Sequence, residues 1–200
     1  MHVGHTGVDG VPCWIAAAAT GALKLKIAET ARLRLRQLTL DDAPLVLALL
    51  SDPDFIKNVG DRGVHSATDA RRYIESGPLA SYERYGFGLY LVELKSPADE
   101  IGMCGLLRRD THADVEIGFA LLPRFRRQGY TLEAARAVVH LATGPLGLTR
   151  IVAIVAPFNL ASIRILETLG MKYERQVNYA PDGSESSLFV LATATKGSAH

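Results

Sequence analysis

Apolar and polar residues alternate with a regular period in several segments of this chain, and the period predicts which segments form strands. Residues 32–36 read Arg-Leu-Arg-Leu-Arg, a strict period of two that is typical of a strand. Further strands are predicted at 87–94, 100–108, 115–122, 151–156, 172–179 and 186–191. The run at 151–156 is apolar throughout, as expected for a strand that is buried on both faces.

Apolar residues recurring three or four positions apart predict about four helices. They lie at about 40–50, 68–82, 131–143 and 160–169, and the last two end at Gly144-Pro145 and Gly170. Residues 52–66, which contain Pro53, Gly60 and Gly63, predict a loop. The order is one strand, two helices, three strands, a helix, a strand, a helix and two strands. It predicts a mixed α/β (α+β) domain with an antiparallel front half.

The length of 200 residues fits a single domain, which we place at 29–195. Residues 1–28 are rich in Gly and Ala and predict a poorly ordered N-terminal extension. Val11 to Ala19 is almost wholly apolar, but no Lys or Arg precedes it, and it is too short to cross a bilayer. The stretch therefore predicts neither a secretory signal nor a membrane anchor.

Charge and cysteine content narrow the functional classes. Lys and Arg number 22 against 21 Asp and Glu, so there is no global case for binding nucleic acid or a membrane. Cys13 and Cys104 cannot build a disulfide framework, which favours a reducing, cytoplasmic location. The six histidines lack metal-ligand spacing, so we expect no metal.

The segment 121–135 has the clearest chemistry. A predicted strand leads into Pro123-Arg124-Phe125-Arg126-Arg127-Gln128-Gly129-Tyr130 and then into a helix. The first amides of a helix have no intrahelical partner, and the helix dipole favours an anion beside them. Gly129 permits a close approach of the backbone, so the segment predicts a pyrophosphate site. The alternative is a solvated basic loop before an ordinary helix.

Three motifs, in order, resemble one family. Arg126-Arg127-Gln128-Gly129-Tyr130-Thr131 is similar to its R/Q-x-x-G-x-G/A loop, and Glu133-Ala134 follows as in G-Y-x-x-E-A. Residues 114–119 (Asp-Val-Glu-Ile-Gly-Phe) resemble A-E-I-G-Y, and residues 159–171 resemble N-x-x-S followed by L-x-x-L-G-F. From about Thr30 to Leu191 the chain resembles the GNAT superfamily of N-acetyltransferases, within it the branch that acetylates the N-terminal alanine or serine of ribosomal proteins.

The resemblance implies a twisted, mostly antiparallel sheet that splays between its fourth and fifth strands and admits acetyl-CoA. It places the pantetheine on backbone groups near Phe119 and Leu121, with Asn159 as a helix cap and cofactor contact. It places the diphosphate on the loop residues Arg126, Arg127, Gln128, Gly129, Tyr130 and Thr131. Thr131 departs from the family's Gly or Ala.

The resemblance also implies direct attack of a neutral primary amine on the thioester in a ternary complex. Glu116 is the candidate base, with burial expected to raise its pKa toward neutrality; the alternative is a structural glutamate. The position of the family's general-acid tyrosine holds Leu166, while Tyr130, Tyr173 and Tyr179 are near in sequence. The acids Asp52, Asp54 and Asp61 either hold a cationic amine or form a solvated loop.

The leading functional prediction is therefore N-acetylation of a protein or peptide α-amine. The alternatives are acetylation of a small amine, such as a polyamine, amino acid or aminoglycoside, and a non-catalytic acyl-CoA-binding module. A nicotinamide-dependent oxidoreductase is a poor fit, because no G-x-G-x-x-G follows the first strand. An exposed edge of the last strands could pair in a homodimer.

Overall fold

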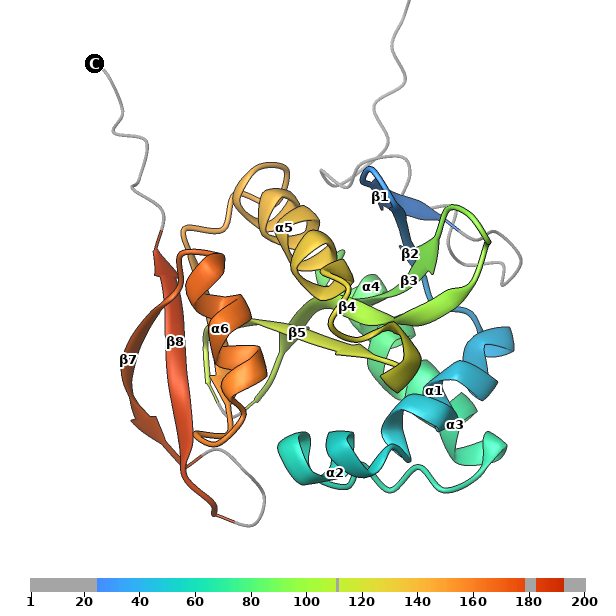
Figure 1. The fold of residues 1–200 in the computed structure, drawn as a ribbon, viewed down its shortest axis with the longest axis horizontal. Helices are drawn as coiled ribbons and strands as arrows, with labels where there is room; N and C mark the ends of the chain where they lie inside the picture. The colour runs from blue at the N-terminus through green and yellow to red at the C-terminus, as the bar shows by residue number, and fades with distance from the viewer. Residues whose placement is uncertain (1–24, 111, 179–182, 193–200) are drawn as a thin grey trace, which may run out of the picture.

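Eight strands form one sheet in the computed structural model, which describes residues 25–110, 112–178 and 183–192 (Figure 1). The strands are β1 (Lys26–Glu29), β2 (Leu33–Gln37), β3 (Leu89–Leu94), β4 (Glu100–Arg108), β5 (Val115–Leu121), β6 (Arg150–Val155), β7 (Lys172–Val177) and β8 (Ser186–Ala192). Their spatial order is β1-β2-β3-β4-β5-β6-β8-β7, and every neighbouring pair except β5–β6 is antiparallel. The predicted mixed, mostly antiparallel sheet is confirmed.

The sheet begins earlier than the sequence pattern indicated. β1 pairs with β2 through Lys26↔Arg36 and Ala28↔Leu35, so residues 26–28 belong to the sheet and not to the predicted extension. Four residues with no clear periodicity give no strand signal by themselves, and this strand forms because β2 offers it an edge. The rest of the extension, residues 1–24, lies outside the described residues.

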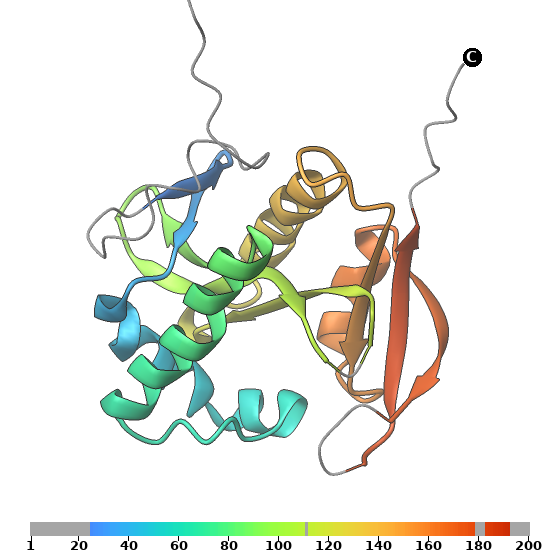
Figure 2. The same cartoon turned by 180° about the vertical axis from the view of Figure 1, so that it is seen from behind.

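The helices lie on both faces of the sheet. They are α1 (Ala43–Leu50), α2 (Pro53–Val59), α3 (Ala67–Ile74), α4 (Ala80–Tyr85), α5 (Tyr130–Thr143) and α6 (Leu160–Thr168), with short turns η2 (Leu40–Asp42) and η4 (Pro123–Phe125). A π-helical segment, η3 (Glu75–Leu79), joins α3 to α4 and accommodates Pro78. Figures 1 and 2, viewed from opposite sides, place α5 on one face and the α3–α4 run on the other.

The prediction of a loop over 52–66 was wrong for its first half, because α2 spans Pro53–Val59. Proline was interpreted as a breaker, but here it occupies the first helical position, where its fixed φ suits a helix start. Asp52 precedes it as the cap residue and Asp54 lies in the first turn, where acids complement the helix dipole. Among the described residues, no helix is both long and apolar enough to cross a membrane.

The sheet opens between β5 and β6. These two parallel strands are paired only at Val115↔Ile151 and Glu116↔Val152. Beyond Glu116 the strands diverge, so the remaining length of β5 is paired with β4 alone. The predicted splay between the fourth and fifth predicted strands is confirmed, and it leaves one backbone edge of β5 open toward a notch.

A buried arginine anchors the start of the domain. Arg36 on β2 is 1% exposed, whereas Arg34 on the same strand is exposed. Its guanidinium donates two hydrogen bonds of 2.8 Å to Asp42, one of 2.6 Å to Glu93 and one of 2.8 Å to Glu100. Asp42 is itself 2% exposed, so the pair lies inside the protein with its hydrogen bonds satisfied.

Candidate active site

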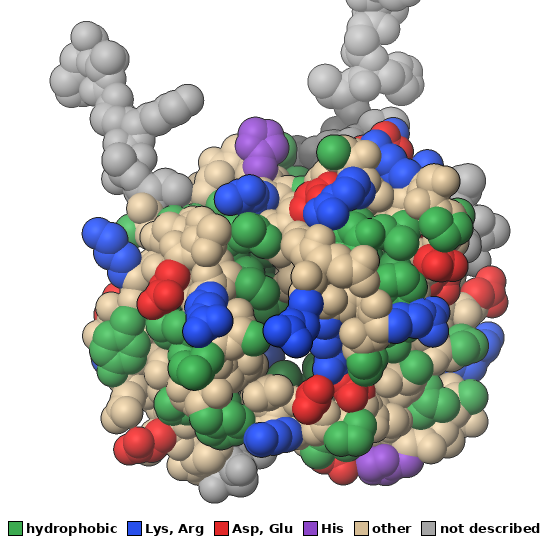
Figure 3. Space-filling model, in the orientation of Figure 1, with side chains coloured by type: hydrophobic (Ala, Val, Ile, Leu, Met, Phe, Trp, Pro, Cys, Tyr) green, Lys and Arg blue, Asp and Glu red, His purple; other side chains and the backbone are tan. Residues whose placement is uncertain are grey.

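A cavity of about 440 Å³ extends from the notch between β5 and β6 to the helices α2, α3 and α4. Its lining includes Glu116, Gly118 and Phe119 of β5, Asn159 and Leu166 at α6, and residues of the α2–α4 region. Figure 3 shows the face with α5 and α6, which is hollowed at its centre and bordered by basic side chains. The cavity therefore joins the open strand edge to the helical layer on the other side of the notch.

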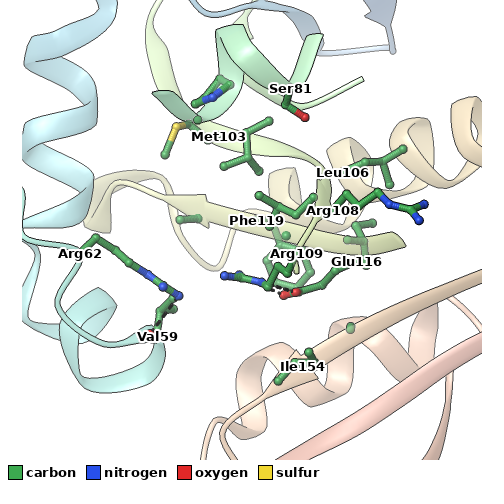
Figure 4. A pocket seen from close by; sticks show the side chains of 18 of the residues that line it. Val59, Arg62, Ser81, Met103, Leu106, Arg108, Arg109, Glu116, Phe119 and Ile154 are labelled. Carbon is green, nitrogen blue, oxygen red and sulfur yellow. Dashed lines mark hydrogen bonds and ion pairs between the residues drawn. The ribbon is translucent and has the colours of Figure 1, made fainter. Parts of the chain in front are cut away.

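Glu116 lines this cavity and is 5% exposed (Figure 4). Its carboxylate accepts a hydrogen bond of 2.6 Å from Arg109 Nε, and His112 Nε2 lies 3.7 Å from the same oxygen. Burial alone would raise the pKa of Glu116, but the bonds and charges of His112 and Arg109 outweigh burial and hold this pKa below its ordinary value.

This result corrects the expected electrostatics of Glu116. The carboxyl was expected to have a raised pKa, and instead it is a stable carboxylate in an ion pair. The site residues predicted from the sequence did not include Arg109 and His112, which follow β4 and precede β5. The hairpin register, in which Leu107 faces Glu116, is the signal that could have placed Arg109 near the carboxylate.

The tyrosines that line the cavity differ from those named by sequence. Leu166 is buried in the lining, Tyr130 and Tyr173 do not line it, and Tyr179 lies outside the described residues. Tyr73 and Tyr85 line it instead, from the α3–α4 run. Burial raises the pKa of Tyr73, so its hydroxyl stays protonated at neutral pH and can donate a hydrogen bond.

The predicted diphosphate loop has the backbone of an anion site. Arg127 and Gly129 both have positive φ, at 62° and 82°, and Gly129 is the cap residue of α5. Within the described part of the chain, no backbone carbonyl accepts a hydrogen bond from the amides of residues 127–131. Arg127, Gln128 and Gly129 are exposed, so these amides are accessible to an anion at the start of a 14-residue helix.

Arg126 is less available than the sequence implied. Its guanidinium is paired with Asp52 and with Asp54, the latter at 2.7 Å, and its Nε donates to the carbonyl of Leu121 at 2.9 Å. Asp61 lies 3.4 Å from the exposed His65. Asp52, Asp54 and Asp61 are absent from the cavity lining. Asp52 and Asp54 instead tie α2 to the diphosphate loop through Arg126. The Leu121 carbonyl already accepts a bond, which leaves Phe119 as the better placed of the two predicted strand contacts.

Asn159 and Thr131 each lie at the start of a helix, as predicted. The Asn159 side chain accepts a hydrogen bond of 3.2 Å from the Ser162 amide, which confirms it as the N-cap of α6, and it also lines the cavity. Thr131 lies in the first turn of α5 and is half-buried. Across the described residues, no group of three or more His, Cys, Asp or Glu side chains is placed to hold a metal ion.

A clamp built on Arg32 holds the diphosphate loop. The Arg32 side chain donates to Glu133 at 2.7 Å and to the Gln128 carbonyl at 3.1 Å, and it lies 4.4 Å above the Tyr130 ring. Thr30 and the Arg32 amide also donate to Glu133, and these bonds lower its pKa against the effect of burial, which raises it. The Glu and Tyr of the G-Y-x-x-E-A motif therefore position the loop through Arg32.

We predict that Glu133→Ala weakens acetyl-CoA binding by about tenfold, equivalent to ~1.4 kcal/mol, because the loop loses one anchor of this clamp. Isothermal titration calorimetry measures the change. Glu83→Ala, at an exposed acid of α4 outside the cavity lining, is the matched control and should leave the affinity unchanged. An unaltered dissociation constant for Glu133→Ala would mean that the loop holds its shape without the clamp.

Comparison with known proteins agrees with this fold. Residues 32–172 match the family model described as the acetyltransferase (GNAT) domain. The chain is 32% identical over 150 residues to the uncharacterized N-acetyltransferase YoaA of Bacillus subtilis (strain 168), covering 74% of this chain and 84% of that protein.

Two solved structures share the fold. The GNAT-family acetyltransferase from Bacillus anthracis has a TM-score of 0.70 at 23% identity, covering 84% of this chain and 98% of that one. RimL, a ribosomal L7/L12 α-N-protein acetyltransferase in complex with coenzyme A, has a TM-score of 0.70 at 17% identity, covering 84% and 97%. The chain belongs to the GNAT family of N-acetyltransferases.

Proposed function

We propose that this enzyme transfers the acetyl group of acetyl-CoA to the α-amine of an amino acid or peptide, with a protein N-terminus as the leading acceptor. The observation that carries the proposal is the continuous cavity that joins the open edge of β5 to the α2–α4 layer, with Glu116 between them. One side of the notch offers a route for the cofactor and the other a space for the acceptor.

The cofactor would lie across the start of α5 and the notch. The amides of residues 127–131 are suited to the diphosphate, because they are unpaired within the described residues and lie at a helix N-terminus. The pantetheine would pair with the open edge of β5 near Phe119, and Asn159 lines the opposite side of the cavity. This arrangement would bring the thioester toward Glu116.

The reaction is a direct transfer. The lone pair of the neutral amine attacks the thioester carbonyl carbon, the tetrahedral adduct collapses, and the C–S bond breaks to release the CoA thiolate. The proton lost by the amine passes to solvent or to a neighbouring group, and the thiolate takes a proton in turn. The protonated hydroxyl of Tyr73 lines the cavity and is a candidate donor, a role that Leu166 cannot perform.

The electrostatics of Glu116 favour an α-amine acceptor over a lysine or polyamine. A carboxylate with a lowered pKa is a weak base, so the acceptor must supply much of the neutral form itself. At pH 7, deprotonation costs an α-amine on the order of 1 kcal/mol, whereas a lysine side chain costs about 5 kcal/mol. Glu116 would orient the amine or a water by accepting its hydrogen bond.

We predict that Glu116→Gln lowers kcat by about a hundredfold while acetyl-CoA binding survives, because the lost carboxylate lies beyond the diphosphate site. The pH profile gives a second readout. We expect kcat/KM to rise as the acceptor amine loses its proton near pH 8. The pKa of Glu116 is below its ordinary value, so the profile should show no step for Glu116 above about pH 6. Steady-state assays of CoA release across pH test both statements.

Three results would separate the alternatives. A step between pH 6 and 7 that vanishes in Glu116→Gln would assign this carboxyl a raised pKa and a role as general base. A Glu116→Gln enzyme with full turnover would leave Glu116 as a structural partner of Arg109. Acetyl-CoA binding without turnover on any amine would favour a non-catalytic acyl-CoA-binding module.

A further inference from the structure

The cavity contains more positive than negative charge. Four arginines line it, Arg62, Arg84, Arg108 and Arg109, against two acids, Asp110 and Glu116. The chain as a whole is nearly neutral, with a formal net charge of +1, so this excess is local. A partly enclosed site with unbalanced charge favours ligands of the opposite sign.

Three of the four arginines already have partners. Arg109 forms its ion pair with Glu116 at 2.6 Å. Arg84 and Arg108 lie 5.1 Å and 5.8 Å from the centre of the Tyr85 ring, in cation–π contact. Each of these three side chains therefore already interacts with another group of the protein.

Arg62 is different. It lies on the loop between α2 and α3, it is half-buried, and Figure 4 shows its side chain extending into the cavity toward Arg109. Its guanidinium donates a hydrogen bond of 3.3 Å to the backbone carbonyl of Val59. Among the described residues, no carboxylate lies within 4.0 Å of its guanidinium.

Keeping this guanidinium in the cavity has a cost. Burial lowers the pKa of Arg62, and the nearby charge of Arg109 lowers it further, against the weaker opposing charge of Glu116. An anion bound beside Arg62 would relieve both effects. Tyr73 lines the same cavity and offers a second hydrogen-bond donor, because its hydroxyl remains protonated.

We propose that Arg62 binds a carboxylate of the acceptor, so that the enzyme prefers α-amine substrates that carry a negative charge close to the amine. The guanidinium fork matches a carboxylate with two parallel hydrogen bonds. The same charge repels polyamines and aminoglycosides from the cavity. This inference rests on the proposed function, since it identifies the class of acceptor for the same site.

The carboxylate has two possible sources, the C-terminus of a very short acceptor or an acidic first side chain of a longer one. Two matched pairs of probes distinguish them: Ala-Ala against Ala-Ala amide, and Glu-Ala-Ala amide against Gln-Ala-Ala amide. The α-amines within each pair are chemically similar, so a difference in kcat/KM reports on the carboxylate. We expect a preference of about tenfold for the anionic member of at least one pair, as a charge-assisted hydrogen bond provides.

Three variants assign that preference to Arg62. Arg62→Gln should raise KM about tenfold for the preferred anionic probe, with kcat and the KM of its neutral partner little changed. Arg62→Lys keeps the charge and should retain part of the preference. Arg72→Gln removes an exposed arginine of α3 that is absent from the cavity lining, and it should behave as the unsubstituted enzyme. Thermal unfolding of each variant checks that the fold is retained.

Equal kcat/KM within both pairs would overturn the inference while leaving the α-amine acetyltransferase intact. A preference that survives Arg62→Gln would equally overturn it, because another group would then bind the carboxylate. Failure of the unsubstituted enzyme to acetylate any of the four probes, with acetyl-CoA still bound in calorimetry, would count against the proposed function itself. The three outcomes are therefore distinguishable.

Discussion

Gly129→Asp is expected to weaken acetyl-CoA binding at least a hundredfold. A carboxylate at this position would face the diphosphate at the start of α5, and two unit charges 4 Å apart near a protein surface interact with about 4 kcal/mol. A Cβ at Gly129 would also lie 3.4 Å from Arg32 Nη2, so the new acid would compete with Glu133 for the clamp. Isothermal titration calorimetry with acetyl-CoA and with CoA measures the loss.

The control for this prediction is Gly147→Asp. Gly147 also has a positive φ, 63° against 82°, but a Cβ there has nothing within 4 Å, and it lies on the turn after α5. It introduces the same charge and a similar backbone strain away from the loop, so acetyl-CoA binding should be unchanged. Equal losses in the two variants would show that strain or net charge, and not the diphosphate, explains the effect.

Arg36→Met is expected to destabilise the fold by about 3–5 kcal/mol, because it leaves the buried Asp42 carboxylate without its cation. For a chain of this size the melting temperature should fall by on the order of 10 °C. Arg34→Met is the matched control on the same strand. Arg34 is 45% exposed, and its closer ion pair is with Glu29 at 3.2 Å, so its loss should cost less than about 1 kcal/mol.

The buried Arg36–Asp42 ion pair also predicts that the stability of the fold depends on pH. Burial raises the pKa of Asp42, but bonds from Arg36 and Thr39 outweigh it, so the folded-state pKa lies below that of the unfolded chain. The stability that Asp42 contributes is therefore present above about pH 4 and is lost as the pH falls through the folded-state pKa. Without Arg36 this contribution is reduced, so the stability gap between the two proteins should narrow on acidification. A gap that is constant from pH 7 to pH 3 would contradict this account of the Arg36–Asp42 pair.

Local patterns in the sequence predicted most of the fold. Strict alternation marked β2, the apolar run marked β6, and the Gly129-Tyr130 turn marked the start of α5. β1 was missed because it forms only against the edge of β2, and α2 was missed because Pro53 can either break or begin a helix. These failures occur where the structure depends on a distant partner or on a residue with two local meanings.

The same distinction holds for the residues of the candidate site: those in continuous motifs were predicted, and those brought in from distant segments were not. Glu116, Asn159 and the diphosphate loop belong to continuous motifs, so each could be named from its neighbours in the chain. Arg62 and Tyr73 reach the cavity from the α2–α3 loop and from α3, and nothing in their local sequence indicates proximity to β5. The lowered pKa of Glu116 was also missed, because the expectation rested on burial alone and left out His112 and Arg109 in the β4–β5 turn.

One competition assay tests the central claim most directly. The peptide Glu-Lys-Ala, which offers an α-amine, a lysine amine and carboxylates in one molecule, is incubated with acetyl-CoA, and fragment-ion mass spectrometry locates the acetyl group. We predict acetylation of the α-amine, with one CoA released for each peptide modified and with loss of the product in Gly129→Asp. Acetylation of the lysine amine, or bound acetyl-CoA with no acetylated peptide, would contradict an α-amine acetyltransferase.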